Sequence, residues 1–205
     1  MTQPAEQRHA VRRERIVGEL LPIVEDLLAA APYFELKVEQ IIQRAGMARS
    51  TFYRYFQDKG ELLLAVSEPA IADILAAASR VWELPADATR EDLETTMRNV
   101  IVQYRPHTPL MQAMVETSAY DAAVRAAFQG AWSAARASQA DHIRHGQAEG
   151  WIRPELDPEE TSGWLVWMAE RGMYQLVPGA DDAALDRLSR SFAAILWHTL
   201  YAEKT

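Results

Sequence analysis

Apolar residues recur every three to four positions along most of the chain, which is the spacing of one face of an α-helix. The first such segment covers about residues 16–28. It contains Pro22, which removes a backbone donor, so we expect a kink near Leu21 or a later helix start. No convincing alternation of apolar and polar positions is present, and Asn-Gly and Asp-Gly hairpin turns are absent. The pattern predicts an all-α protein.

Start and stop signals divide the remaining pattern into helices. A short helix is predicted over 38–45, ended by Gly46, and a second over about 49–55. Asp58 and Glu61 precede an apolar run and resemble a capping box, so a longer helix is expected from about Lys59 to about residue 82. Further helices are expected over the ranges 90–104, 109–119, 121–148, 158–177 and 181–201.

Charge is distributed unevenly along the 205 residues, whose net charge is −8. Residues 1–60 hold 9 lysines and arginines against 8 acids, whereas residues 61–205 hold 12 against 21. All six tryptophans lie in the second part. A near-neutral first part permits a local surface for a polyanion on an otherwise acidic molecule. We therefore expect two domains, residues 10–60 and residues 61–205.

Several classes of protein are disfavoured by the composition. The sequence contains no cysteine, which excludes disulfides, thiolate zinc sites and a cysteine nucleophile. The polar first residues do not resemble a secretory signal, and no run approaches the 18–20 apolar residues of a membrane span. His142 and His145 lie three apart on a predicted helix, but without a third ligand a solvated pair is favoured over a metal site. We expect a cytoplasmic protein that is no enzyme and needs no cofactor.

The segment Arg49–Phe56 carries four aromatic rings and two arginines. On a helix, Phe52 and Phe56 share one face, which predicts that they are core residues. Tyr53, and with it Tyr55, is assigned to the outer side. The two short helices around Gly46 then form a candidate helix-turn-helix, whose second helix enters the major groove of DNA. Spacing alone does not separate this motif from a helical corner with a solvated Arg and Tyr surface.

The segment RAGMARSTFYRYFQDKGELLLAV, residues 44–66, resembles the DNA-binding domain of the TetR family. Matching positions include Gly46, Thr51, Phe52, Tyr53 and Lys59. TFYRYF and MAERGMY suggest the subgroup of ethionamide-resistance repressors. The resemblance implies a three-helix DNA-binding domain followed by a helical domain for ligand binding and dimerisation. It also implies that the DNA-contacting residues are Lys37, Arg49, Ser50, Thr51, Tyr53, Arg54, Tyr55 and Lys59.

Two positions depart from the family pattern. Ala48 stands where a serine N-cap is common, and Lys37 stands where threonine or serine is common. Loss of a cap costs about 1 kcal/mol. Lys37 can still meet a phosphate as a cation, so the kind of contact changes.

The second part of the chain contains a helix, about 158–177, that is apolar almost all round and so must be buried on more than one side. The resemblance implies that the last two helices pair with a second copy. Glu170 and Arg171 need partners in this setting, at the interface or on a ligand. Large rings and methionines suit an apolar or aromatic effector. Core packing is favoured for each of these residues taken alone, and the resemblance implies the cavity as a whole. The candidate cavity residues are Tyr104, Met111, Met114, Phe128, Trp132, Trp167 and Tyr174.

The resemblance implies a ligand-responsive transcriptional repressor that binds a palindromic operator as a homodimer and leaves it when a small apolar or aromatic molecule binds. The alternative is a helical protein that binds small molecules or lipids and retains the head domain without specific DNA binding. No catalytic arrangement such as Ser-His-Asp and no phosphate-binding glycine loop is present in the sequence, which disfavours an enzyme.

Overall fold

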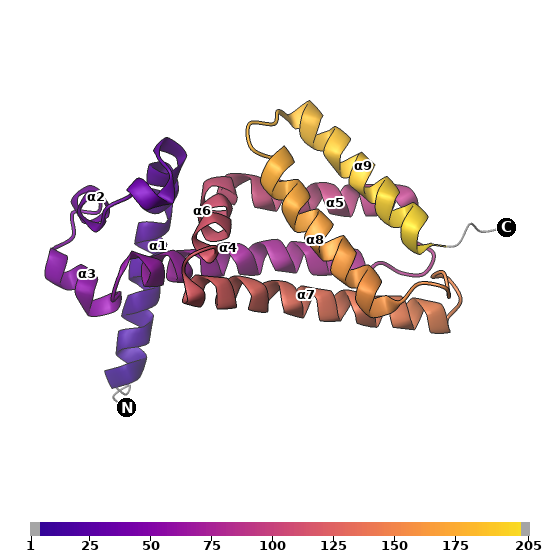
Figure 1. Ribbon diagram of the computed structural model, residues 1–205, viewed down its shortest axis with the longest axis horizontal. Helices are drawn as coiled ribbons and strands as arrows, with labels where there is room; N and C mark the ends of the chain where they lie inside the picture. Colours follow the sequence, from indigo (N-terminus) through magenta and orange to yellow (C-terminus); the bar gives the residue numbers. More distant parts are fainter. Residues whose placement is uncertain (1–4, 202–205) are drawn as a thin grey trace. The chain divides into compact units, whose positions relative to one another are not determined.

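The structure is a computed structural model that describes residues 5–201, with side chains described from residue 7 onwards. Within this range the ordered elements are helices, joined by loops and one isolated bridge between Ile152 and Tyr201. Figure 1 shows the helices in chain order. The predicted all-α class is confirmed.

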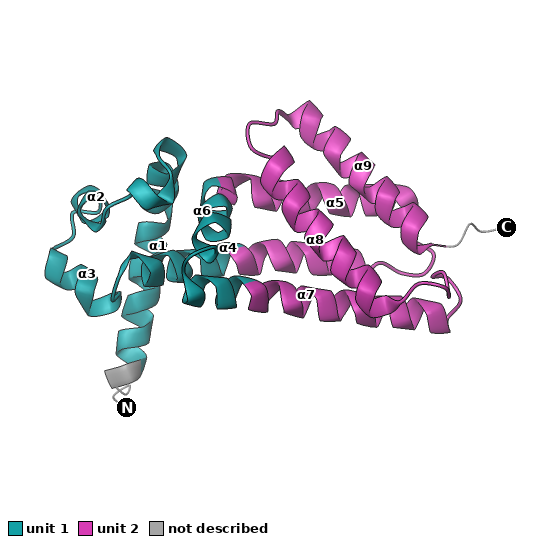
Figure 2. Ribbon diagram, in the orientation of Figure 1, with its two compact units in different colours: residues 1–70, 109–128 teal, residues 71–108, 129–205 magenta. Residues whose placement is uncertain are grey.

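The contacts group the chain into two units (Figure 2). Unit 1 comprises residues 1–70 and 109–128, and unit 2 comprises residues 71–108 and 129–205. The predicted division at residue 60 stays a prediction, because a contact grouping does not test a domain boundary. Each unit is described by itself below.

Unit 1 contains the amino-terminal helices and a later segment of the chain. Its elements are α1 (Ala5–Ala30), the short 3-10 helix η1 (Tyr33–Glu35), α2 (Val38–Arg44), α3 (Arg49–Tyr55), the first half of α4 (Lys59–Trp82), nearly all of α6 (Thr108–Ser118) and the start of α7 (Ala122–Ala148). Helix α1 is continuous through Pro22. Leu20 and Val24 are almost fully buried on either side of the proline, and their burial opposes the cost of about 3 kcal/mol for the missing donor.

Unit 2 is built from the second half of α4, α5 (Arg90–Tyr104), the 3-10 helix η2 (Arg105–His107), most of α7, α8 (Pro158–Leu176) and α9 (Asp182–Leu200). Its core is a cluster of buried aliphatic side chains from these helices, centred on Leu93, Ile143, Leu165 and Leu196. The bounds of the helices from α4 to α9 lie within about two residues of those predicted, whereas α1 starts at Ala5, about eleven residues before the predicted segment, so the expected later start is wrong.

Side-chain caps fix several helix starts where the sequence predicts them. At α4 the Asp58 carboxylate accepts from the Glu61 N–H at 2.9 Å, and the Glu61 carboxylate reaches back to the Gln57 N–H at 2.8 Å. The D-x-x-E pattern therefore marks a helix start, although its second bond ends one residue earlier than in a capping box. At α9 the Asp181 carboxylate accepts from the Ala184 N–H at 2.7 Å.

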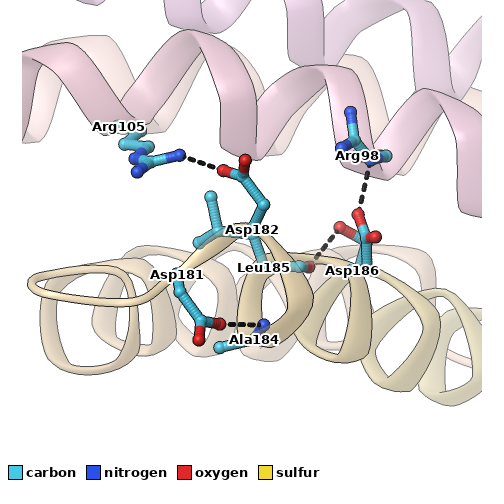
Figure 3. Close-up of polar contacts among 8 residues, drawn as sticks. Arg98, Arg105, Asp181, Asp182, Ala184, Leu185 and Asp186 are labelled. Carbon is cyan, nitrogen blue, oxygen red and sulfur yellow. Dashed lines mark hydrogen bonds and ion pairs between the residues drawn. The ribbon is translucent and has the colours of Figure 1, made fainter.

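Two ion pairs in unit 2 join α9 to α5 and to η2, which directly follows α5 (Figure 3). Arg98 lies 2.6 Å from Asp186, and Arg105 lies 2.5 Å from Asp182. The two arginines lie about two helical turns apart, and the two aspartates lie about one turn apart on α9. Formation of both pairs therefore favours one position of α9 along the axis of α5. Their side chains are exposed, so each pair contributes at most about 1 kcal/mol.

Helix α4 is long and apolar enough to cross a membrane by length and composition, with a mean hydropathy of 1.6 over 18 residues. The sequence-based expectation that no segment comes near this limit therefore does not hold for α4. Core helices of soluble proteins pass the same test.

Candidate DNA-binding surface and ligand cavity

The inner side of α3 is the core of its unit. Phe52 and Phe56 are 0% and 1% exposed, and their ring centroids lie 5.4 Å apart. The i, i+4 spacing places both rings on the buried face. The prediction that these two rings hold α3 in its unit is confirmed.

The outer side of α3 presents polar and aromatic groups. Arg49, Ser50, Tyr53 and Arg54 are exposed, and Thr51 is half-buried. The Arg49 guanidinium donates to the Glu39 carboxylate at 2.8 Å and lies 5.5 Å from the centre of the Tyr53 ring. Guanidinium and hydroxyl groups of this kind bind phosphates and base edges.

The turn between α2 and α3 depends on Gly46, whose φ is +60°. Helix α3 starts at Arg49, and its N-cap residue Ala48 provides no side-chain cap, as the sequence predicts. Lys37 is exposed at the start of α2, where its backbone N–H donates to the Gln40 side-chain oxygen at 2.7 Å. Its ammonium is therefore not used in capping.

Tyr55 does not lie on the outer side, so that prediction is wrong. It is 6% exposed, and its ring is stacked on His9 of α1 at 5.1 Å between centroids. Tyr55 lies beside the buried face formed by Phe52 and Phe56, and its ring packs against α1. Its assignment to DNA contact is untested. Such a contact would use only the small exposed part of a mostly buried ring.

Lys59 is engaged inside its own unit. Its ammonium donates to the carbonyls of Tyr33, Phe34 and Leu36 at 2.9, 3.3 and 3.0 Å, and it lies 4.5 Å from the centre of the Tyr33 ring. These bonds use the three donors of an ammonium group. Partial burial lowers the pKa of Lys59 from its usual value. In this arrangement the side chain stabilises the η1 turn, and a phosphate contact would compete with these carbonyls.

Unit 2 contains an apolar cavity of about 230 Å³ among α4, α5, α7, α8 and α9. Its wall includes Trp82, Met97, Trp132, Gln139, Met173 and Phe192. No ionisable side chain belongs to this wall. A space lined by rings and aliphatic groups with few polar atoms suits a small apolar molecule.

Of the seven residues predicted to line a cavity, Trp132 lies in this wall. Met111, Met114 and Phe128 are buried in unit 1, and Tyr104 is buried in unit 2 outside the wall. Trp167 is 45% exposed. Tyr174 is half-buried, with the Arg171 guanidinium 5.0 Å from its ring centre. The structure therefore does not bring the seven together.

The sequence-based selection missed Trp82, Gln139 and Phe192. Trp132, Ala135 and Gln139 follow one another at i, i+3 and i+7 on α7, and all three line the cavity. That helical spacing indicates one face of α7 and would have placed Gln139 beside Trp132. A selection by aromatic rings and methionines alone leaves out a glutamine.

The exposed side of α8 is unusually apolar. Large apolar side chains that stay exposed on α8 and α9 are Trp164, Trp167, Met168, Leu176 and Ile195, with Trp164 77% exposed. Trp164, Trp167 and Met168 share one face of α8 by their spacing, and exposed apolar groups gathered in this way are typical of interaction surfaces.

Glu170 on α8 is 4% exposed, and its nearest ionic partner is Arg171 at 3.7 Å. Burial raises the pKa of Glu170, and the Arg171 charge opposes that rise.

The two histidines of α7 differ in their surroundings. His145 is exposed, but His142 is 8% exposed, so the prediction of a solvated pair is wrong for His142. The His142 Nδ1 lies 2.8 Å from the Trp82 carbonyl, and burial lowers the pKa of the imidazole. Across residues 5–201 no group of three or more potential ligands is placed to hold a metal ion.

Two family models match the chain. Residues 25–66, which contain α2 and α3, match the model of the TetR family of bacterial regulatory proteins, and residues 108–192 match that of the tetracyclin repressor-like C-terminal domain. The chain belongs to the TetR family. Over 189 residues it is 27% identical to the HTH-type transcriptional regulator EthR of Mycobacterium tuberculosis, covering 90% of this chain and 86% of EthR.

Solved structures of other TetR-like regulators share this fold. A TetR-family regulator from Mesorhizobium loti superposes with a TM-score of 0.69 at 18% identity, covering 94% of this chain and 98% of its own. A regulator from Saccharomonospora viridis, solved in complex with choline, gives 0.72 at 17% identity, covering 92% and 99%. The ketosteroid regulator KstR2 of M. tuberculosis gives 0.68 at 18%, covering 91% and 95%.

TetR-family proteins are DNA-binding transcription regulators, and ligand-dependent repression is typical of them. They are regulators and not enzymes. The family match thus places α2 and α3 in the DNA-binding domain. The cavity wall on α7 and α8 falls within the match to the C-terminal domain.

Proposed function

We propose that this chain is a ligand-responsive repressor that binds a palindromic operator as a homodimer. The observation that carries the proposal is the two-sided α3. Its buried phenylalanines fix the helix, while Arg49, Ser50, Tyr53 and Arg54 are exposed together on the outer side. A helix presented in this way fits the major groove, with Lys37 and Thr51 as phosphate contacts at its edge.

Dimerisation through α8 and α9 is supported by the exposed apolar side chains on these helices. A second copy would bury Trp164 and its neighbours. A two-fold dimer also presents two α3 helices, which suits half-sites one helical turn, about 34–36 Å, apart. We expect the protein to act in the cytoplasm, where the DNA is.

Release by an effector is supported by the cavity in unit 2, whose wall is almost entirely apolar. The choline complex of the S. viridis regulator is a precedent for a small molecule bound to this fold. An effector that binds the DNA-free conformation more tightly shifts the population away from the operator.

The test is a gel shift of the purified chain on the DNA flanking its own gene. Tyr53→Ala should abolish the shifted band while the dimer persists in size-exclusion chromatography with light scattering. Tyr120→Ala removes another exposed tyrosine of unit 1 and should leave the band in place. Unchanged binding by Tyr53→Ala, or equal loss in both variants, would argue against α3 as the DNA surface.

A second candidate function is small-molecule or lipid binding without specific DNA recognition. It is favoured by the engagement of Lys59 with three carbonyls and by the burial of Tyr55, which weaken two expected DNA contacts. Specific DNA binding depends steeply on salt. Purified protein that shows no salt-dependent preference for its flanking DNA over unrelated DNA would favour this second function.

A further inference from the structure

We infer that the cavity in unit 2 takes a neutral molecule with an apolar body and one hydrogen-bond donor, which Gln139 accepts. The inference rests on the proposed function, because it treats the cavity as the effector site. It adds a chemical class to the effector and assigns a specificity-determining residue.

Gln139 is the polar residue that distinguishes this wall. It is 7% exposed, and its Oε1 atom is buried with no hydrogen-bond partner. A buried acceptor without a donor bears the cost of lost hydration. A ligand that brings an N–H or O–H to this oxygen removes the cost, whereas a ligand without a donor leaves it in place.

The two serine hydroxyls of the wall do not place the same requirement on a ligand. The Ser79 hydroxyl donates to the Ala76 carbonyl at 3.0 Å, and Ser138 is exposed. No acid or base lines the cavity. A charged ligand would therefore lose its hydration without an ionic partner, which is far more costly than burial of a neutral group. Trp82, Trp132 and Phe192 offer a quaternary ammonium cation–π contacts, so choline serves below as the cationic probe.

The size of the cavity limits the ligand further. A cavity of about 150 Å³ holds benzene, so 230 Å³ corresponds to roughly ten non-hydrogen atoms. Trp82, Trp132 and Phe192 give the wall aromatic surfaces, and aromatic pairs add favourable contacts to the burial. A bicyclic aromatic molecule with one N–H matches the space, the surfaces and the acceptor.

The test uses probes of one shape that differ in a single group. Indole carries an N–H donor, benzofuran an acceptor in its place, and indene neither. Calorimetric titration of the full chain without DNA should give a dissociation constant for indole about tenfold lower than for benzofuran or indene, with no binding of choline. Equal affinity for indole and indene, tighter binding of benzofuran, absence of indole binding at millimolar concentration, or binding of choline in the cavity would each overturn the inference.

Variants locate the effect. Gln139→Met keeps the length of the side chain and removes the acceptor, so indole should weaken about tenfold and indene should not. Gln129→Met changes an exposed glutamine of the same helix and should alter neither. Val166→Phe fills the cavity and should abolish binding of all three bicyclic probes. A preference for indole that persists in Gln139→Met, or in Val166→Phe, would contradict the assignment.

Folding of each variant is checked by thermal unfolding, and the ratio of indole to indene affinity in the unchanged protein decides the donor question even if Gln139→Met is unstable. These titrations contain no DNA, so they are separate from the gel shift. Selective indole binding without operator binding would leave the ligand class standing and remove the repressor. Operator binding without indole selectivity would do the reverse.

Discussion

The ammonium of Lys59 donates a hydrogen bond of 2.9 Å to the backbone carbonyl of Tyr33, 26 residues earlier in the chain. The bond ties the start of α4 to the η1 turn. A lysine at the start of this helix was expected to bind a DNA phosphate, and the structure gives the same side chain a second task within unit 1.

Lys59→Met should lower the free energy of unfolding by about 1–2 kcal/mol, because three carbonyls lose their donor. If the role is structural, operator binding weakens but the slope of log affinity against log salt stays the same. A lost phosphate contact would instead reduce the slope by about 1. Lys37→Met, at an exposed lysine, is the matched case in which the slope should fall.

Gly46→Ala should destabilise the protein by about 1–2 kcal/mol, since φ at this turn is +60° and a Cβ disfavours it. Apart from the adjoining residues, no heavy atom lies within 4 Å of an added Cβ, so the loss comes from the backbone conformation. Urea unfolding measures it. Gly46→Asn should cost less. At Gly130, inside α7 and also without near neighbours, alanine should stabilise by about 0.5 kcal/mol, and an equal loss at both glycines would refute the explanation.

Trp164→Glu should weaken the proposed dimer by about 2 kcal/mol, roughly 30-fold in its dissociation constant. The reason is that Trp164 on α8 is 77% exposed in the single chain and contributes burial energy only when a second subunit covers it. Sedimentation equilibrium gives the constant. Val102→Glu, on α5, alters another exposed apolar residue of the same unit and should leave the dimer unchanged; a monomer in both cases would point to unfolding.

Stability should fall as the pH drops below about 6.5, in part because of His142. Burial lowers the pKa of this imidazole in the folded protein from the ordinary value of 6.5. The unfolded chain therefore binds the proton first, and folding loses free energy as the pH passes below 6.5 towards the folded pKa. Glu170 has the opposite effect on stability. Its pKa is raised in the folded protein, so its contribution favours folding more as the pH falls towards 4.5, the ordinary pKa of the unfolded chain. Comparison of His142→Gln with the unchanged protein at pH 7.5 and 5.5 isolates the histidine, and an identical pH dependence would exclude it.

Helix positions followed from the sequence because their signals are local. Gly46, Asp58 and Asp181 mark ends and starts through bonds to residues within four positions. The core role of Phe52 and Phe56 followed from their spacing of four residues, although Phe56 is the C-cap residue just after α3. Such features need no knowledge of which helices meet.

The remaining site features depend on segments far apart in the chain. Tyr55 is buried because His9 of α1 covers it, and Lys59 is occupied because η1 places three carbonyls beside it. Neither arrangement produces a periodic pattern in the sequence from which it could be predicted. The cavity is harder still, since an empty volume depends on where side chains from five helices fail to meet.

The ion pairs that join α9 to α5 and η2 have a practical consequence for measurement. Arg98, Arg105, Asp182 and Asp186 are exposed, and ions in solution screen such pairs. The two helices are also held by the buried core around Leu93 and Leu196, which electrolyte does not weaken. An electrolyte titration that strips the protein from nucleic acid should thus leave its circular dichroism unaltered, so the two events can be separated in one cuvette.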